Sequence, residues 1–263
     1  MKEINENWPE APSTPIVSVV MPAYNAERTI EASINSVIGQ TFAYWELIIV
    51  NDCSTDGTAS MINEYAAKDP RICVYHACEN QGVAASRNYA LELAQGEWIA
   101  FLDSDDLWRE EKLEKQLRLA EETSAVITYT ATAYMNVAGQ MSDYVLPAEA
   151  MLPYKTLLRR NIMSCSSVMV HKGAMMPFPL RADTHEDYVV WMTIVRDVGC
   201  AQGLDEPLLV YRMSAGSKSA GRWRSAVMTY NAYRQVGYGV FVSLVFTLRY
   251  SFHSIIKRFQ IRI

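Results

Sequence analysis

The sequence predicts an α/β protein with a mostly parallel central sheet that is flanked by helices. Short apolar segments alternate with helical segments over about the first 105 of its 263 residues, and such alternation is typical of a parallel sheet covered on both faces. Polar residues directly follow three of the apolar segments, and parallel sheets bind ligands outside the carboxyl ends of their strands. A more mixed second half and a C-terminal helical tail are expected to follow.

The first half alternates regularly between apolar runs and helical patterns. The β-branched run at 16–20 predicts a buried strand. Ile30, Ile34 and Val37 then recur at helical spacing before Gly39, a residue type that suits a helix end. The predicted strands of this half are 16–20, 45–50, 71–77 and 97–102, and its predicted helices are 27–40, 58–68 and 83–96.

The second half mixes strands and helices less regularly. Charged and apolar residues at helical spacing predict a helix at 109–122. The apolar run at 125–146 predicts two strands around a turn at Ala138–Gly139. The remaining predicted elements are a strand at 164–172, a helix at 186–199 and a last strand at 207–213.

Composition bounds the class of protein. The chain is 50% hydrophobic with a formal net charge of −5, which fits one large domain with a sizeable core. The five cysteines form no C-x-x-C pair, as expected of reduced thiols in a cytosolic protein. The segment 1–15 is polar and acidic, unlike a secretory signal, and we expect it to be a flexible lead-in.

Basic residues are concentrated at the C-terminus. After Glu206 the remaining 57 positions hold nine basic residues and no acidic one. Many aromatic residues lie in the segment 222–263, and its uncharged stretch at 235–248 is shorter than the roughly 20 residues that span a bilayer. The segment fits either a helix pair that covers the core or an amphipathic anchor at an anionic membrane surface. Nucleic-acid binding is disfavoured, because the rest of the chain is acidic and no nucleic-acid motif occurs.

Three carboxylates follow the fourth predicted strand. Asp103 and Asp105 are expected to alternate on a strand-like backbone, so that both point to one side. Paired carboxylates there suit Mg²⁺ or Mn²⁺, which shares its coordination with water and phosphates. Surface acids and helix caps also produce this D-x-D pattern. Asp106 is explained as a cap or first-turn acid of the next helix.

Other polar residues admit two explanations on local grounds. Asp52 either belongs to a turn or accepts a hydrogen bond from a nucleobase. Arg87 is either an ordinary helix-surface residue or a fork for phosphate. Glu186 and Asp187 either begin a helix, where acids are favoured by its dipole, or supply a general base. No G-x-G-x-x-G turn and no G-K-[ST] occurs, which argues against a Rossmann dehydrogenase and a P-loop NTPase.

Three longer motifs stand in order along the chain. They are "VSVVMPAYNAERTIEASINSVIGQTFAYWELIIVNDCSTDGT", "NQGVAASRNYALELAQGEWIAFLDSDDLW" and "EDYVVW". Together they resemble the family 2 glycosyltransferases, whose fold is called GT-A, over roughly residues 16–212. The resemblance implies a GT-A domain at 16–221, with a nucleotide-binding half at 16–106 and an acceptor half at 107–221. A basic amphipathic helical segment at 222–263 would follow it.

By this resemblance the chain binds a nucleoside-diphosphate sugar, with UDP as the expected nucleotide. The nucleotide pocket is expected to be lined by Pro22, Tyr24, Glu27, Asp52, Arg87 and Asp103. Within it, Asp52 would contact the base and Asp103 would lie near the ribose and the metal. Asp105 would coordinate a divalent metal, Mn²⁺ or Mg²⁺, under the diphosphate. Arg212 and Lys218 are expected to contact the diphosphate, unless Arg212 only balances the nearby acids.

The resemblance further implies an inverting transfer by direct displacement. Asp187 matches the general base for the acceptor hydroxyl, with Glu186 as a supporting acid. The acceptor is expected to be a saccharide or lipid-linked saccharide in lipopolysaccharide, capsule or exopolysaccharide biosynthesis. The protein would be cytoplasmic and contact the inner face of the cytoplasmic membrane through 222–263. The rivals are an inactive nucleotide-sugar-binding protein and a sugar-1-phosphate nucleotidyltransferase, whose Gly-rich loop is absent from "MPAYNAERT".

Overall fold

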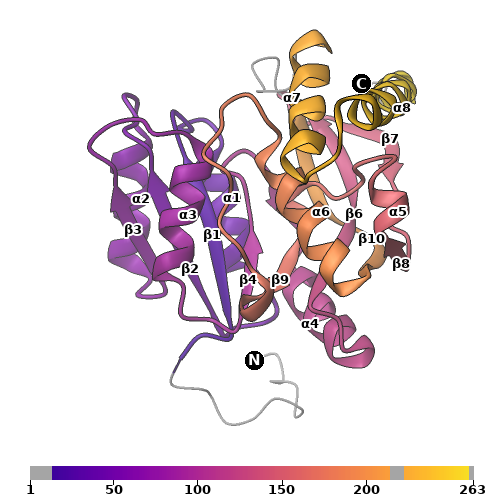
Figure 1. Ribbon diagram of the computed structural model, residues 1–263. Coiled ribbons are helices and arrows are strands. Elements are labelled where there is room, and N and C mark those ends of the chain that lie inside the picture. The colour runs from indigo at the N-terminus through magenta and orange to yellow at the C-terminus, as the bar shows by residue number, and fades with distance from the viewer. Residues whose placement is uncertain (1–13, 214–221, 261–263) are drawn as a thin grey trace.

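One mixed sheet crosses the molecule, and helices pack on its two faces (Figure 1). The computed structural model describes residues 14–213 and 222–260. The first half has the predicted alternation of strands and helices. Its strands are β1 (Val17–Ala23), β2 (Trp45–Asn51), β3 (Ile72–His76) and β4 (Trp98–Phe101), and its helices are α1 (Ile30–Ile38), α2 (Thr58–Lys68) and α3 (Val83–Leu93).

The second half is mixed, as predicted, and holds several short elements that the sequence did not indicate. Its strands are β5 (Leu107–Trp108), β6 (Ile127–Asn136), β7 (Met141–Leu146), β8 (Met151–Pro153), β9 (Met169–His171) and β10 (Cys200–Met213). Its helices are α4 (Lys112–Thr123), α5 (Tyr154–Leu157), α6 (Glu186–Val198), α7 (Arg222–Gln235) and α8 (Val240–Gln260). The last two helices confirm the predicted helical tail.

The strand order confirms the predicted parallel half. β3, β2, β1 and β4 lie side by side and run parallel. β9 then pairs antiparallel with both β4 and β6, and β10 runs parallel to β6. Because β6 and β10 therefore run in the direction of β4, their carboxyl ends lie along the same edge of the sheet as those of β1 and β2.

Two predicted strands have other bounds in the structure. The run at 164–172 forms a 3₁₀ turn at Cys165–Ser167 before the short strand β9. The hydroxyl of Ser167 donates to the carbonyl of Ser164 at 2.7 Å, and such local hydrogen bonds compete with strand formation. β10 begins at Cys200 instead of 207. The first residues of β10 are mixed and partly polar, so no apolar run indicated that the strand begins there. A register shift also interrupts its pairing with β6.

The core is divided between the two faces of the sheet. In β1, Val17 and Val19 belong to one hydrophobic cluster and Val20 to the other, as the two-residue period of a strand requires. Trp191 of α6 is fully buried and packs on Phe101, the last residue of β4, with ring centroids 5.4 Å apart. This contact fixes α6 beside the carboxyl end of β4.

Helices α7 and α8 pack on the body of the protein through aromatic side chains. The Tyr233 hydroxyl of α7 donates to the carbonyl of Leu158 at 2.7 Å, and its ring lies 5.8 Å from that of Tyr188 in α6. From α8, Phe246 packs on Tyr233 and Tyr250 packs on Tyr188, with centroids 5.4 and 5.7 Å apart. Among the described residues, no helix is long and apolar enough to cross a membrane.

Gly96 precedes β4 at a point that leaves no room for a side chain. Its amide donates to the hydroxyl of Ser18 at 2.8 Å. A Cβ atom at this position would lie 2.6 Å from the amide nitrogen of Ser18 and 2.8 Å from the carbonyl carbon of Val17. Both atoms belong to the backbone of β1, a central strand, so neither can yield without moving the sheet.

We expect Gly96→Ala to lower the free energy of unfolding by about 2 kcal/mol, because the added methyl group overpacks a backbone contact. Gly239→Ala is the matched control, since a Cβ there meets no atom within 4 Å, and it should change stability by less than about 1 kcal/mol. Urea unfolding followed by circular dichroism measures both. Equal values for the two variants would contradict this account of the contact.

Candidate active site

The predicted polar clusters meet at one edge of the sheet. β1 lies between β2 and β4, with Ala23 opposite Asn51 and Val20 opposite Phe101. The loops that follow these three strands therefore start from neighbouring positions at the carboxyl edge, where open sheets bind ligands. Helix α6 begins near the same place, because Trp191 packs on Phe101.

The carboxylates after β4 lie on a turn at 103–106, which we call the acid turn. β4 ends at Phe101, and the amide of Asp106 donates to the carbonyl of Asp103 at 3.1 Å. Ser33 of α1 fastens this turn, because its hydroxyl lies 2.8 Å from the carbonyl oxygen of Asp106. The prediction that Asp103 and Asp105 alternate along a strand is therefore wrong. The turn, and not the strand pleat, positions both carboxylates.

Asp106 is a buried anchor and not a helix-start acid. It is 1% exposed, and its carboxylate accepts from the Ser166 hydroxyl at 2.7 Å and from the Arg212 amide at 2.9 Å. The next helix, α4, begins only at Lys112, because the strand β5 intervenes. The prediction for Asp106 is therefore wrong. This side chain ties the acid turn to the end of β10 and to the 3₁₀ turn before β9.

The acid turn concentrates negative charge in a half-buried place. Burial and then the charge of Asp103 raise the pKa of Asp105 to about 6. Burial and the neighbouring carboxylates also raise the pKa of Asp106 well above its usual range. A divalent cation would relieve this repulsion, and Mg²⁺ and Mn²⁺ prefer carboxylate oxygens. The two carboxylates of Asp103 and Asp105 therefore fit such a cation if water and phosphate complete its coordination. Among the described residues, no group of three or more His, Cys, Asp or Glu could hold a metal ion.

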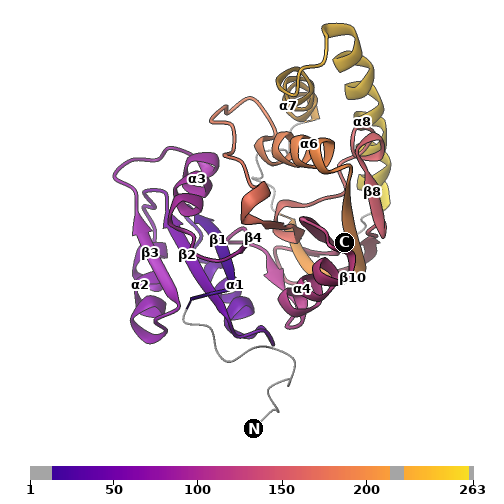
Figure 2. The same cartoon turned by 60° about the horizontal axis from the view of Figure 1, so that its bottom comes forward.

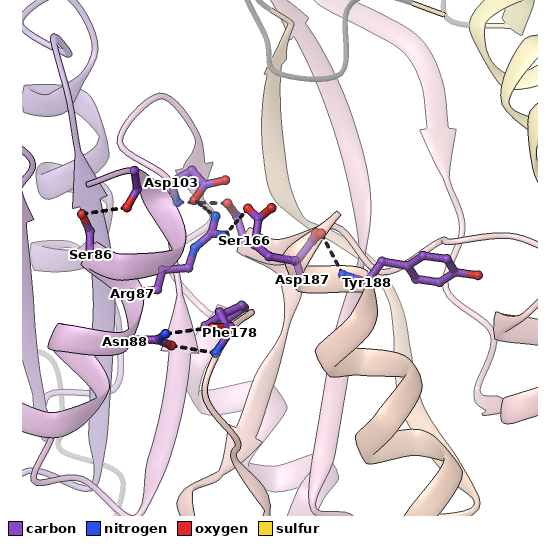
Figure 3. Close-up of polar contacts among 10 residues, drawn as sticks. Ser86, Arg87, Asn88, Asp103, Ser166, Phe178, Asp187 and Tyr188 are labelled. Carbon is purple, nitrogen blue, oxygen red and sulfur yellow. Dashed lines mark hydrogen bonds and ion pairs between the residues drawn. The ribbon is translucent and has the colours of Figure 1, made fainter. Parts of the chain in front are cut away.

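Arg87 joins the acid turn to α6. It lies on α3 and is 3% exposed. One terminal nitrogen of its guanidinium lies 2.6 Å from Oδ1 of Asp103, and the other lies 3.2 Å from Oε1 of Glu186. Figure 3 shows the arginine reaching from its helix toward both elements. Arg87 is therefore not the surface residue that its helical position allowed, and its charge is shared by carboxylates from both halves of the chain.

Glu186 and Asp187 begin α6 beside this arginine. Glu186 is 6% exposed, whereas Asp187 is half-buried and accepts from the amide of Tyr188 at 2.8 Å (Figure 3). Burial and then the charge of Glu186 raise the pKa of Asp187. His185 and Arg87 oppose that shift. A carboxylate with a raised pKa that keeps some exposure is suited to accept a proton.

Asp52 closes a corner at the end of β2. It is 3% exposed, and its two carboxylate oxygens accept from the amides of Gln81 and Gly82, each at 2.8 Å. Gly82 has a φ of +89°, a conformation that glycine adopts readily. Asp52 thus holds the loop that leads into α3, which lies about 30 positions later in the sequence. Its contact with a nucleobase stays a prediction.

Three further residues predicted for the nucleotide pocket come from the end of β1 and the loop after it. Pro22 is buried within β1, and Tyr24 is 51% exposed at its end. The carboxylate of Glu27 accepts from the amide of Gly57 at 2.8 Å, which ties the loop after β1 to the start of α2. The structure brings all three to the carboxyl edge near Asp52, and their contacts with a nucleotide stay predictions.

Arg212 lies at the acid turn, near the end of β10. Its Nε donates to the carbonyl of Asp105 at 2.9 Å, and its amide donates to the carboxylate of Asp106. Its charge opposes the raised pKa of Asp105, and its contact with the diphosphate stays a prediction. Lys218, the other residue expected at the diphosphate, lies outside the described residues.

Sequence reasoning missed two residues that support the site. The hydroxyl of Ser166 accepts from the amide of Asp103 at 3.0 Å. Asn88 bonds to the backbone of Phe178 twice, at 2.8 and 2.6 Å, directly below Arg87 in Figure 3. The polar run "SCSS" and the pair "RN" were the available signals, but nothing in the sequence links either to a partner many residues away.

The fold and the site together define a class of protein. A mixed sheet flanked by helices, with the acid turn at the carboxyl edge of its parallel half, is the architecture of the GT-A glycosyltransferases. The chain belongs to glycosyl transferase family 2, since the sequence profile of the family described as "Glycosyl transferase family 2" matches residues 18–180. The resemblance to this family is thereby confirmed, and the matched residues include the first two sequence motifs except Val17.

Individual relatives extend this result. The chain is 39% identical over 233 residues to TuaG of Bacillus subtilis (strain 168), named as a teichuronic acid biosynthesis glycosyltransferase, with 88% of this chain and 90% of that protein covered. It is 34% identical over 214 residues to the Escherichia coli UDP-Glc:alpha-D-GlcNAc-diphosphoundecaprenol beta-1,3-glucosyltransferase WfgD, with 80% and 81% covered. Among solved structures, the mannosyltransferase PcManGT from Pyrobaculum calidifontis in complex with GDP-Man and Mn²⁺ has a TM-score of 0.67. That match covers 97% of this chain and 79% of the other at 18% identity, and it supports the shared fold alone.

We expect Arg87→Gln to lower the free energy of unfolding by about 3 kcal/mol, because it takes the guanidinium away from a buried carboxylate. The Arg87→Gln/Glu186→Gln double variant should lose less free energy of unfolding than the two single variants lose together. The difference, which is the coupling energy of the pair, should be at least about 1 kcal/mol. Urea unfolding of the four proteins measures the cycle.

Arg181→Gln is the control for this cycle. Arg181 pairs with Asp183 on the surface, where the side chains are 60% and 52% exposed, so its loss should change stability far less than the loss of Arg87. Additive effects of Arg87→Gln and Glu186→Gln would contradict the assigned coupling between the acid turn and α6.

Proposed function

We propose that this protein transfers a sugar from a nucleoside-diphosphate sugar, with UDP as the expected nucleotide, to a hydroxyl of a saccharide or lipid-linked acceptor. The observation that carries the proposal is the Arg87 ion-pair bridge. Arg87 joins Asp103 of the acid turn, which would face the donor, to Glu186. Glu186 and Asp187 form the acid pair that would face the acceptor. Membership of glycosyl transferase family 2 supports the reaction class.

Asp187 is proposed as the general base. It would take the proton of the acceptor hydroxyl while that oxygen attacks the anomeric carbon of the donor. The bond from this carbon to the diphosphate oxygen would break on the opposite face, so the configuration inverts. The half-buried position and raised pKa of Asp187 support this role, and Glu186 would keep Arg87 and the start of α6 in place.

A divalent cation, Mn²⁺ or Mg²⁺, is proposed at Asp105 and Asp103. When bound, it would neutralise charge on the leaving diphosphate. Arg212 lies at the same turn and would add a fixed positive charge beside the phosphates. The raised pKa of Asp105, which reflects burial and the neighbouring carboxylate, supports a cation there.

The remaining pocket residues are proposed to hold the nucleotide. Asp52 would contact the base, and Pro22, Tyr24 and Glu27 would line the pocket beside it. Their common position at the carboxyl edge supports this assignment. Lys218 lies outside the described residues, so its proposed contact with the diphosphate has only the sequence behind it.

The proposed setting is bacterial surface-polysaccharide biosynthesis, such as lipopolysaccharide, capsule or exopolysaccharide, at the inner face of the cytoplasmic membrane. The names of the relatives support it, because TuaG is named for teichuronic acid biosynthesis and WfgD for transfer to a diphosphoundecaprenol-linked sugar. An acceptor of this type is held in a membrane. The basic segment 222–263 is proposed to contact that membrane.

Asp187→Asn is expected to reduce sugar transfer by about 10²–10⁴-fold, because it removes the base and keeps the shape of the side chain. Transfer is measured with a panel of nucleotide sugars, Mn²⁺ and a diphosphate-linked saccharide acceptor. Donor affinity, measured by calorimetry, should change by less than about threefold.

Asp197→Asn is the matched control for Asp187→Asn, because Asp197 lies near the end of the same helix with a 64% exposed side chain. It should transfer sugar at the wild-type rate. Full activity of Asp187→Asn would assign the base elsewhere. Tight donor binding by the wild-type protein without transfer to any acceptor would instead support the inactive binding protein.

Asp105→Asn is expected to abolish the effect of the metal. With UDP present and Mn²⁺ at about a hundredfold excess over its Kd, the native wild-type protein should gain about 2.7 kcal/mol and melt at a higher temperature. Thermal unfolding measures the gain, which Asp105→Asn should lose. Asp143→Asn is the control, since Asp143 is an exposed acid on β7. An unchanged Mn²⁺ response in Asp105→Asn would remove Asp105 from the metal site.

A further inference from the structure

Helix α8 leaves one apolar face uncovered. Phe241, Leu244, Leu248 and Phe252 are 78%, 50%, 71% and 64% exposed, and we call them the α8 stripe. They are spaced three, four and four residues apart, so they fall within about 80° around the helix. Scattered exposed apolar residues are ordinary, but a continuous row of large ones marks an interaction surface.

The opposite face of α8 fixes how the stripe is presented. Phe246 and Tyr250 pack on aromatic rings of α7 and α6, and Ser243 and Thr247 are buried. The hydroxyl of Thr247 donates to the carbonyl of Ser243 at 2.7 Å, and the hydroxyl of Ser243 donates to the carbonyl of Tyr238, just before the helix, at 3.4 Å. Rotation of α8 would break these contacts, so the stripe points away from the body of the protein.

The two helices of the tail also expose arginines. Arg249 is exposed on α8, and Arg224 is exposed on α7 beside Trp223, which is 83% exposed. No acidic residue occurs after Glu206 anywhere in the sequence. The two C-terminal helices therefore expose apolar and basic side chains without acidic ones, whereas the remainder of the chain is acidic.

The two C-terminal helices stand on the side of the molecule where the site lies. The hydroxyl of Ser225 in the first turn of α7 lies 3.3 Å from Nε2 of His185, the residue that precedes the acid pair of α6. Figures 1 and 2 show α8 alongside α7 and α6, away from the α2 and β3 end of the sheet. In Figure 1, α8 is seen almost along its axis, so it runs across the direction of the strands.

We propose that the α8 stripe lies in the surface of an anionic lipid bilayer. Exposed aromatic and aliphatic side chains would enter the acyl boundary, and arginines would meet the headgroups. Charge decides against a second copy of this chain on the stripe, because two such basic surfaces repel each other. The inference rests on the proposed function in one respect, since a lipid-linked acceptor would place the site at a bilayer.

Co-sedimentation with lipid vesicles tests the proposal on the full chain. Vesicles of phosphatidylglycerol mixed with phosphatidylcholine should bind the wild-type protein, and pure phosphatidylcholine should bind it more weakly. Leu248→Ser/Phe252→Ser should weaken binding to the anionic vesicles at least about tenfold. Arg224→Gln/Arg249→Gln should weaken it too, and added salt should reduce the remaining difference between the two vesicle types.

Val137→Ser/Met151→Ser is the matched control, because these side chains are 70% and 61% exposed on the β6–β7 turn and β8. It should bind vesicles like the wild type, and circular dichroism melts should show all variants folded. Unchanged binding by Leu248→Ser/Phe252→Ser would overturn the proposal. Concentration-dependent dimers that this variant abolishes, without vesicle binding, would also overturn it in favour of a second copy.

The readout separates this inference from the proposed function. Vesicle binding needs neither donor nor acceptor, so Asp187→Asn should bind vesicles as the wild type does. If the stripe variant transfers sugar to a water-soluble acceptor normally and still binds vesicles normally, the proposal for the α8 stripe fails and the proposed transfer reaction stands. If the wild-type protein binds vesicles through the stripe but transfers no sugar, only the proposed function fails.

Discussion

One buried positive charge organises the candidate site. A guanidinium taken out of water costs several kcal/mol unless carboxylates compensate it. Arg87 has such partners in Asp103 and Glu186, which are 83 positions apart in the sequence. The stable arrangement is therefore the one in which the acid turn and α6 are both in place.

Apolar packing prepares the position that this charge occupies. Phe101 ends β4 just before the acid turn, and Trp191 of α6 packs on it. Phe178 lies against both rings and under the guanidinium of Arg87. The aromatic cluster supplies non-directional attraction between the halves, while the ion pairs fix the distance between specific carboxylates. Asp106 fixes the other side of the turn in a similar way. Its buried carboxylate accepts hydrogen bonds from Ser166 and from the backbone of β10.

The sequence was most informative where a local pattern decides the structure. The buried run of β1 and the helical spacing of Ile30 and Ile34 need no knowledge of distant residues, so the parallel half and its alternation were predictable. The acid turn was located but its geometry was not, because the backbone after Phe101 turns to bond Asp106 to Asp103. Asp106 itself was misassigned, since its partners lie sixty or more positions away. Such pairings depend on strand order, which no local pattern contains.

The same limit explains why the tail needed the fold for its interpretation. Its aromatic residues fit a core-covering helix or a membrane-facing helix in sequence, and the structure packs some of them inward and leaves others exposed. Tyr233, Phe246 and Tyr250 pack inward, and Phe241 and Phe252 remain exposed. An acidic body repels an anionic surface, so only the part of the molecule that carries arginine without acid can approach one closely. Because α7 starts beside His185, the basic tail adjoins Glu186 and Asp187. The uneven distribution of charge along the chain would therefore orient the site toward an anionic surface.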